Sequence, residues 1–149
     1  MSDVQIGAMT EYDADVADDM GKILMGLSSK YDGSPIEREW IEDVIESANH
    51  DILLATIDDK LVGVATVSIV MGPLIKKNVY LEDFVVDQKY QGNGIGTRLF
   101  EAVQDWGRKK GCRRLEFTSS GKGKKACAVA FYQKRGAEIR DTNAFRIEL

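Results

Sequence analysis

Cysteine, histidine and proline are scarce in this sequence. Among 149 residues there are two cysteines, Cys112 and Cys127, and one histidine, His50. Two cysteines do not form a disulfide framework, and a single histidine does not supply the ligands of a zinc centre. We therefore expect a metal-free protein of a reducing compartment. The two prolines are isolated and no repeat is visible, so no stretch of the chain is expected to be a linker.

Long apolar runs are also missing. No segment approaches the roughly 20 apolar residues that a membrane-spanning helix needs. Residues 1–19 are acidic and lack the cationic stretch followed by an apolar one that marks a secretory signal peptide. We therefore expect a cytoplasmic protein that does not associate with membranes.

Positive charge is not in excess. The chain has 20 Lys and Arg against 24 Asp and Glu, which gives a net charge of −4. Nucleic-acid binding needs a cationic surface, so no nucleic-acid partner is expected. The content of 44% hydrophobic and 30% charged residues is ordinary for a soluble globular protein. The length fits one domain, residues 1–149, built around one core.

The first half of the chain changes from helical to strand-like spacing. A short strand is expected at residues 4–9 and an amphipathic helix at residues 13–27. A second helix is predicted to begin with Ser34 as its cap and Pro35 as its first residue. Residues 51–57 and 61–71 then read as two strands of a hairpin.

The next predicted strand, residues 79–86, is apolar on both faces, as expected for a strand in the middle of its sheet. It differs from an ordinary core strand because Glu82 and Asp83 stand side by side within it. Regular alternation along the strand places these two carboxylates on opposite faces of the sheet.

The rest of the chain continues the alternation of helices and strands. A helix is expected from the glycine-rich turn at residues 91–97 to about Lys110, where Gly111 ends it. A strand at 113–118, a helix at 122–134 and two short strands at 137–140 and 144–149 follow. The order β-α-α-β-β-β-α-β-α-β-β predicts an α/β fold with a mixed sheet and helices on both faces.

The turn at residues 91–97 is the strongest chemical signal in the sequence. The first turn of a helix leaves backbone N–H groups without partners, and the helix dipole places partial positive charge there. Gly92, Gly94 and Gly96 have no side chains to keep a pyrophosphate away from those groups. Thr97 adds a hydroxyl donor. The pattern predicts a pyrophosphate site that needs no metal.

Three nucleotide-binding patterns compete for these glycines. The lysine of the P-loop is absent, and the spacing G-x-G-x-G differs from the dinucleotide pattern G-x-G-x-x-G. The third pattern, Q/R-x-x-G-x-G/A, is matched by Gln91, Gly94 and Gly96. It is preceded by LEDFVVD and followed by A-x-A-F-Y-x-K-x-G. On these three signals, over residues 79–136, the chain resembles the GCN5-related N-acetyltransferase (GNAT) superfamily.

The resemblance implies a GNAT fold: a mixed, mostly antiparallel sheet of about seven strands that splays in the middle. It also implies acetyl-CoA as the cosubstrate, with its pantetheine arm lying in the gap like an added strand. The arm would bond to the backbone of Phe84, Val85 and Val86. Lys124 and Lys125 lie near a position where many relatives have an asparagine, so a lysine there would meet the phosphates instead. The pyrophosphate would be held by Gln91, Gly92, Asn93, Gly94, Ile95, Gly96 and Thr97.

Two residues are expected to carry the chemistry of acetyl transfer to a primary amine. Glu82, directly or through a water, is the candidate base that makes the amine neutral, although an ordinary surface carboxylate remains an alternative. Tyr132 matches the family's tyrosine that protonates the departing thiolate. No acetyl-enzyme is needed, because the acetyl group passes directly to the amine in a ternary complex. Relatives commonly form homodimers, and we expect one here.

The sequence leaves the acceptor amine open. Tyr31 and Trp40, with Asp32 and Glu37 nearby, are the candidate acceptor-binding residues, and a small molecule, a peptide or a protein amine all fit. Two other functions also stay open. The chain would be a non-catalytic acyl-CoA sensor if it bound the cosubstrate without turnover, or a protein that binds NAD or ATP.

Overall fold

The computed structural model describes residues 3–119 and 126–149. They form two compact units, Met1–Phe117 and Thr118–Leu149, and each unit is described by itself. The second unit contains helix α4 (Ala126–Lys134) and the segment that follows it.

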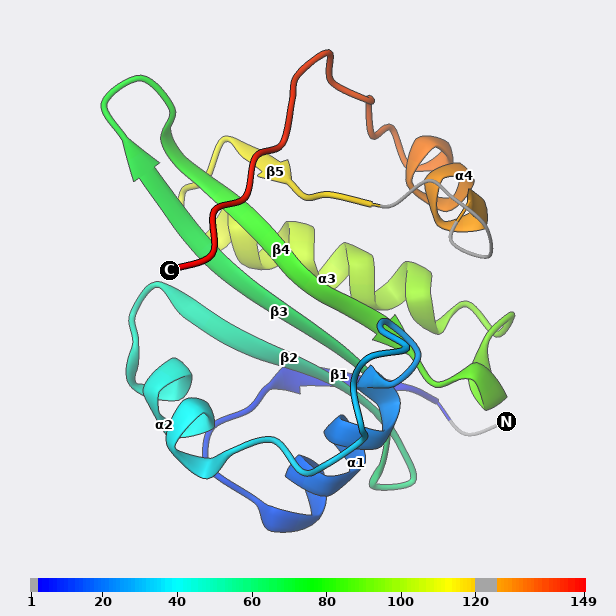
Figure 1. The fold of residues 1–149 in the computed structure, drawn as a ribbon. Coiled ribbons are helices and arrows are strands. Elements are labelled where there is room, and N and C mark those ends of the chain that lie inside the picture. The colour runs from blue at the N-terminus through cyan, green and yellow to red at the C-terminus, as the bar shows by residue number, and fades with distance from the viewer. Residues whose placement is uncertain (1–2, 120–125) are drawn as a thin grey trace. The chain divides into compact units, whose positions relative to one another are not determined.

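The first unit is built on a five-stranded sheet (Figure 1). The strands pair in the order β1-β2-β3-β4-β5, antiparallel except for the parallel pair β4–β5. This confirms the prediction of a mixed, mostly antiparallel sheet. The strands are β1 (Gln5–Ala8), β2 (His50–Ile57), β3 (Lys60–Gly72), β4 (Lys76–Val86) and β5 (Arg114–Glu116).

The prediction of about seven strands is wrong. Residues 137–149 contain no strand, although apolar side chains alternate along 144–149. A strand persists only when a neighbour satisfies its backbone, and the described part of the second unit offers no other strand. Phe145, for example, is 90% exposed. The apolar pattern that predicted two strands is therefore present, but no strand partner accompanies it.

Helix α1 (Ala14–Leu24) begins where the sequence predicts. The carboxylate of Asp13 accepts hydrogen bonds from the N–H groups of Asp15 and Val16, at 2.9 and 3.0 Å. These bonds satisfy two of the donors that a helix leaves unpaired at its N-terminus. Asp13 is therefore the N-cap of α1.

Helix α2 (Arg38–Glu46) begins later than predicted, with Glu37 as its N-cap. The Ser34 hydroxyl donates to the Asp32 carboxylate at 2.6 Å, so it does not cap the helix. The N–H of Ile36 donates to the carbonyl of Ala17 in α1, which ties the segment down before α2 can start. The prediction of Ser34 as cap and Pro35 as first helical residue is wrong for this reason.

Helices cover both faces of the sheet (Figure 1). Helix α3 (Ile95–Lys109) buries Leu99, Phe100 and Val103. The opposite face, here called the α1–α2 face, buries apolar side chains of α1 and α2 against the sheet. Its core consists of Met9, Ala17, Met20, Ile41, Ile52, Leu61, Val64 and Val85. Burying a large aliphatic side chain contributes about 1.5–3 kcal/mol, so both layers hold the sheet firmly.

Two features are absent from the described residues. No helix there has both the length and the apolar character needed to cross a bilayer. The same part of the chain contains no group of three or more His, Cys, Asp or Glu side chains suited to holding a metal ion.

Gly21 in α1 provides a test of this packing. An alanine in a helix is normally more stable than glycine by about 1 kcal/mol. Here a Cβ at position 21 would overlap the backbone carbonyl of Ser34. We therefore expect Gly21→Ala to lower the free energy of unfolding by about 2 kcal/mol in urea denaturation. Gly7→Ala is the control, because a Cβ there meets no atom within 4 Å. A Gly21→Ala protein as stable as the control would contradict this packing.

Candidate active site

Strand β4 has an open edge in its second half. Strand β5 pairs with it only at Asn78, Val79 and Tyr80, whereas β3 accompanies it to Val86. In the described part of the first unit, residues 81–86 therefore have no strand on the β5 side. The family resemblance predicts a splay of the sheet, and β5 ends beside the middle of β4. A strand edge that no other strand covers is a place where an extended ligand can add.

The neighbouring hydrogen bonds indicate which amides face the open edge. The N–H of Asp83 donates to the Thr66 hydroxyl at 3.0 Å, and the N–H of Asp87 donates to the Val62 carbonyl at 2.8 Å. Both acceptors belong to β3. Successive residues of a strand point their N–H groups to opposite edges, so the amides of Phe84 and Val86 face the open edge. In agreement, the Val86 carbonyl accepts from the side chain of Gln91 at 3.1 Å.

A β-bulge interrupts the pairing of β3 with β4. Ala65 pairs with Phe84 and Val67 pairs with Leu81, so Thr66 alone stands opposite both Glu82 and Asp83. The faces on either side of the bulge show the consequence. Val79 contacts α3 at Gly107, and the Phe84 ring meets the Phe100 ring of α3 edge to face, with centroids 5.8 Å apart. Val79 and Phe84 are five residues apart, yet both face α3, whereas in a regular strand residues an odd number apart face opposite sides.

The prediction that Glu82 and Asp83 lie on opposite faces is therefore wrong. It assumed a regular strand. Val79 and Phe84 face α3. Glu82 is three residues after Val79, and Asp83 is one residue before Phe84, so both carboxylates lie on the opposite, α1–α2 face. Asp83 accepts a hydrogen bond from the Thr66 hydroxyl at 2.9 Å, whereas Glu82 is exposed. Glu82 is thus the carboxylate left accessible to a substrate.

Polar side chains shape the turn between β4 and α3. A short 3-10 helix, η1 (Gln88–Tyr90), comes first, and the Asp87 carboxylate accepts from the N–H of Lys89 at 3.0 Å. The side chain of Asn93 donates to the Tyr90 carbonyl at 3.0 Å. With the bond from Gln91 to β4, these contacts fix the loop that leads into α3.

The glycines of the turn adopt conformations that other residues rarely do. Gly92 and Gly94 have φ angles of 84° and 77°, and a Cβ at either would meet no atom within 4 Å. Gly94 is the N-cap of α3 and has no side chain to occupy the first N–H groups. Ile95 is buried and anchors the helix, while Gly96 and Thr97 are half-buried. The helix therefore begins with an accessible N-terminus suited to an anion.

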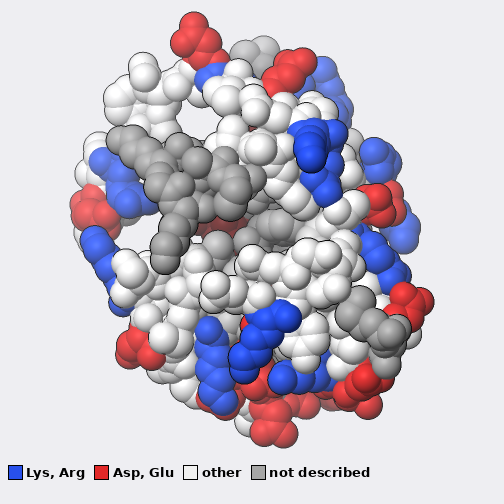
Figure 2. All heavy atoms as spheres, turned by 90° about the vertical axis from the view of Figure 1, so that its right-hand side faces the viewer, with Lys and Arg blue, Asp and Glu red and all other residues white. Residues whose placement is uncertain are grey.

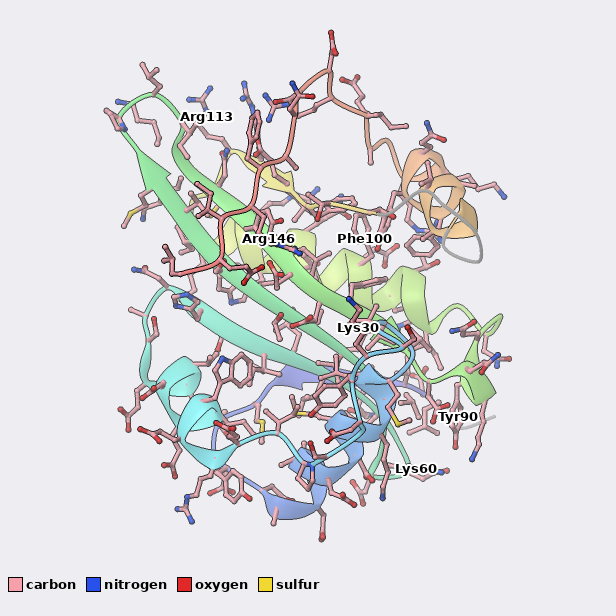
Figure 3. The ribbon with its side chains drawn as sticks, viewed as in Figure 1. Lys30, Lys60, Tyr90, Phe100, Arg113 and Arg146 are labelled. Atoms are coloured by element: carbon pink, nitrogen blue, oxygen red, sulfur yellow. The ribbon has the colours of Figure 1, made fainter. Side chains whose placement is uncertain are left out.

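Lysines and acidic residues surround this turn without forming one basic surface. Lys60, the first residue of β3, has its ammonium group 5.8 Å from the centroid of the Tyr90 ring (Figure 3). Arg98 in α3 forms an ion pair with Asp3 at 2.9 Å. Figure 2 shows Lys and Arg beside Asp and Glu on the lower part of this face. The charge pattern suits a small anionic group better than a nucleic acid.

The candidate acceptor residues occupy the segment around α1 and α2. Tyr31 donates its hydroxyl to the Ser34 carbonyl at 2.6 Å. Trp40 is 41% exposed on α2, which packs on β2 and is separated from β4 by β3 (Figure 1). The segment that follows α1 comes closer to β4, because a Cβ on Gly26 would contact Val85 at 3.6 Å. The structure thus brings this segment, rather than α2, against β4.

Tyr132 lies in α4 of the second unit. Its ring meets the Phe131 ring edge to face, with centroids 5.4 Å apart. Burial raises the pKa of the Tyr132 phenol above its ordinary value of about 10. The phenol is therefore protonated at neutral pH, as a proton donor must be. Lys124 and Lys125 lie outside the described residues.

Residues 18–137 match the model of the Acetyltransferase (GNAT) family. Among curated proteins, the chain is 34% identical over 76 residues to a thialysine N-epsilon-acetyltransferase of Sus scrofa, covering 48% of this chain and 44% of that protein. It is 33% identical over 85 residues to an aminoglycoside N(6')-acetyltransferase type 1 of Stenotrophomonas maltophilia, covering 54% and 55%. The chain spans about half the length of the curated relatives that it matches.

Solved structures share the fold. An aminoglycoside acetyltransferase from an uncultured soil metagenomic sample, in complex with trehalose, superposes with a TM-score of 0.81 at 19% identity, covering 98% of this chain and 97% of that one. The aminoglycoside N-acetyltransferase AAC(6')-Iy in complex with CoA gives 0.76 at 21% identity, covering 99% and 96%. The match to the family model, over most of the chain, confirms the resemblance seen in the sequence: this chain belongs to the GNAT acetyltransferase family, whose cosubstrate is acetyl-CoA.

Proposed function

We propose that this protein transfers the acetyl group of acetyl-CoA to a primary amine. One observation carries the proposal: the open edge of β4 continues through the glycine turn into the N-terminus of α3. An unpaired strand edge suits an extended amide-containing arm, and the helix N-terminus suits a pyrophosphate. Coenzyme A has these two parts in this order.

The residues of β4 and the turn fit such a cosubstrate. The amides of Phe84 and Val86 would bind the pantetheine arm, with Val85 between them packed into the core of the α1–α2 face. The backbone N–H groups that follow Gly94 would hold the pyrophosphate. Gln91 keeps the turn in place through its bond to Val86. In this proposal Lys124 and Lys125 add charge near the phosphates.

Acetyl transfer would proceed directly, in a ternary complex. Glu82 takes a proton from the acceptor ammonium, and the neutral amine attacks the carbonyl carbon of the thioester. The amides at the open edge stabilise the negative charge that develops on the carbonyl oxygen. As the C–S bond breaks, Tyr132 gives its proton to the thiolate, and the nitrogen releases its second proton to solvent. Solvent then returns a proton to Tyr132, and Glu82 gives up the proton that it took. The new C–N bond replaces the C–S bond, so no acetyl-enzyme forms.

The acceptor we propose is a small molecule with a primary amine. The two curated relatives described above are named for thialysine and for aminoglycosides, which are small amines. Tyr31 and Trp40 remain the candidate residues for its recognition, together with Glu82. The single domain, the homodimer and the cytoplasmic location also remain predictions.

The proposal is tested by mixing the protein with acetyl-CoA and a panel of small amines and following release of free thiol. We expect thiol release that depends on the amine, together with an acetylated product in mass spectrometry. Binding of CoA without turnover on any amine would favour the sensor. Stabilisation by NAD or ATP, and not by CoA, would reject acetyl-CoA as the cosubstrate.

Gly94 tests the role of the turn. We expect Gly94→Val to weaken CoA binding about 100-fold, because losing one or two bonds to a charged group costs about 1.5–3 kcal/mol each. Gly111→Val is a matched control: Gly111, after the other end of α3, has φ of 79° and equally open surroundings. Both variants carry the same backbone strain, but only Gly94→Val should raise the CoA dissociation constant in calorimetry. Equal weakening would mean that the turn does not bind the ligand.

Glu82 tests the proposed base. Glu82→Gln keeps the size of the side chain and removes its ability to take a proton. We expect kcat to fall about 100-fold while the dissociation constant of CoA stays unchanged. Glu46→Gln makes the same change on α2, away from β4, and should leave both values as in the wild type. Wild-type turnover in Glu82→Gln would assign the proton to water alone.

Tyr132 tests the proposed acid. Because its raised pKa keeps the phenol protonated, Tyr132→Phe should lower kcat by the same factor, about 100-fold, throughout the range from about pH 6 to 9. Titration of the phenol would contribute only above about pH 10. Steady-state rates across this range, together with CoA affinity, provide the measurement. A parallel loss of rate and affinity would indicate that the ring serves packing.

A further inference from the structure

Thr66 is a polar residue inside an otherwise apolar stretch of β3. Its side chain is almost buried, with 9% of the residue exposed. The hydroxyl makes two hydrogen bonds to one residue of β4. It accepts from the N–H of Asp83 at 3.0 Å and donates to the Asp83 carboxylate at 2.9 Å. Thr66 and Asp83 thus form a closed pair across the bulge.

The pair has a specific effect on the backbone. A bulge puts two residues of one strand opposite one residue of the other, so an amide loses its regular partner in the ladder. The Thr66 hydroxyl accepts the hydrogen bond of that amide. Because the Thr66 hydroxyl donates its hydrogen bond to the Asp83 carboxylate, an oxygen lone pair is directed at the N–H of Asp83. This keeps the Asp83 amide pointing toward β3.

The direction of the Asp83 amide decides what lies at the open edge. Thr66 holds the Asp83 amide toward β3, and the Val62 carbonyl holds the Asp87 amide in the same direction. Because successive amides alternate, those of Phe84 and Val86 point away from β3. We propose that Thr66 is a positioning residue for acetyl-CoA: its hydroxyl sets the register in which β4 receives the pantetheine arm and the thioester. This inference rests on the proposed function and names a residue outside the binding surface.

The test separates the two halves of the cosubstrate. 3′-Phosphoadenosine 5′-diphosphate carries the diphosphate of CoA but lacks the pantetheine arm. In Thr66→Val, which keeps the shape and removes the hydroxyl, we expect CoA to bind about tenfold more weakly. The fragment should bind within about twofold of the wild type, since the glycine turn is untouched. The value of kcat/KM for acetyl-CoA should fall further, by up to about 100-fold, because small misplacements of reacting groups are costly.

Two further variants complete the experiment. Thr66→Ser retains the hydroxyl and should restore CoA affinity and kcat/KM to near the wild-type values. Thr56→Val makes the same chemical change beside the irregularity between β2 and β3, away from β4, and should affect neither ligand. A loss in Thr66→Val that is equal for CoA and the fragment would overturn the inference, as would no loss at all. Wild-type protein that binds neither ligand would instead reject the proposed function, and the inference with it.

Amide hydrogen exchange of the wild type tests the same register without any substitution, should Thr66→Val fail to fold. The amides of Asp83 and Asp87 should be protected with and without CoA, because their bonds to β3 are internal. The amides of Phe84 and Val86 should gain protection when CoA binds and not when the fragment binds. Protection gained at Val85 instead would place the other set of amides at the open edge and overturn the inference.

Discussion

In the described part of the first unit, strand β4 has a neighbouring strand along its whole length on one side only. Strand β3 follows it to Val86, but β5 leaves it after Tyr80. A soluble protein usually protects such an edge, because unpaired strands attract other chains. Here the edge is short and ends at a glycine turn, so it presents a few amides next to a helix N-terminus. The candidate site is the part of the sheet that the fold leaves incomplete.

The bulge opposite Thr66 determines which face of the sheet each residue of β4 packs against. Before it, Val79 packs on α3, and after it, Phe84 packs on α3 while Val85 joins the core of the α1–α2 face. One inserted residue thus anchors the strand on both layers. It also places Glu82 and Asp83 on the same face, where one carboxylate is tied to Thr66 and the other is accessible. Two adjacent residues of the same chemistry therefore have different environments.

Most of the fold was predictable from local signals, because the residues that interact in a helix cap or a hairpin lie close together in the sequence. Asp13 caps α1 through N–H groups two and three residues away, and the hairpin of β2 and β3 follows from apolar alternation around a tight turn. Ser34 does not cap α2, because its hydroxyl donates to the carboxylate of Asp32, which is equally close in the sequence. The bulge depends on two strands at once, so β4 alone did not reveal it. A signal was present all the same: Thr66 is a polar residue within the apolar run of residues 61–67 in β3, and it stands opposite Glu82 and Asp83 of β4.

Glycine shows why the candidate site could be located from the sequence while its details could not. Gly94 and Gly111 flank the two ends of α3 with nearly the same φ, 77° and 79°, and open space around each. The backbone requirement is the same, so conformation alone does not distinguish a ligand cradle from a helix stop. The difference comes from what precedes each glycine. Gly111 follows a helix whose last carbonyls need a C-cap, whereas Gly94 follows the open edge of β4 and precedes the first N–H groups of a helix. A binding role for a glycine therefore follows from the backbone groups beside it that remain accessible to a ligand. Beside Gly94, the groups on the edge of β4 are accessible because β5 pairs with only part of β4.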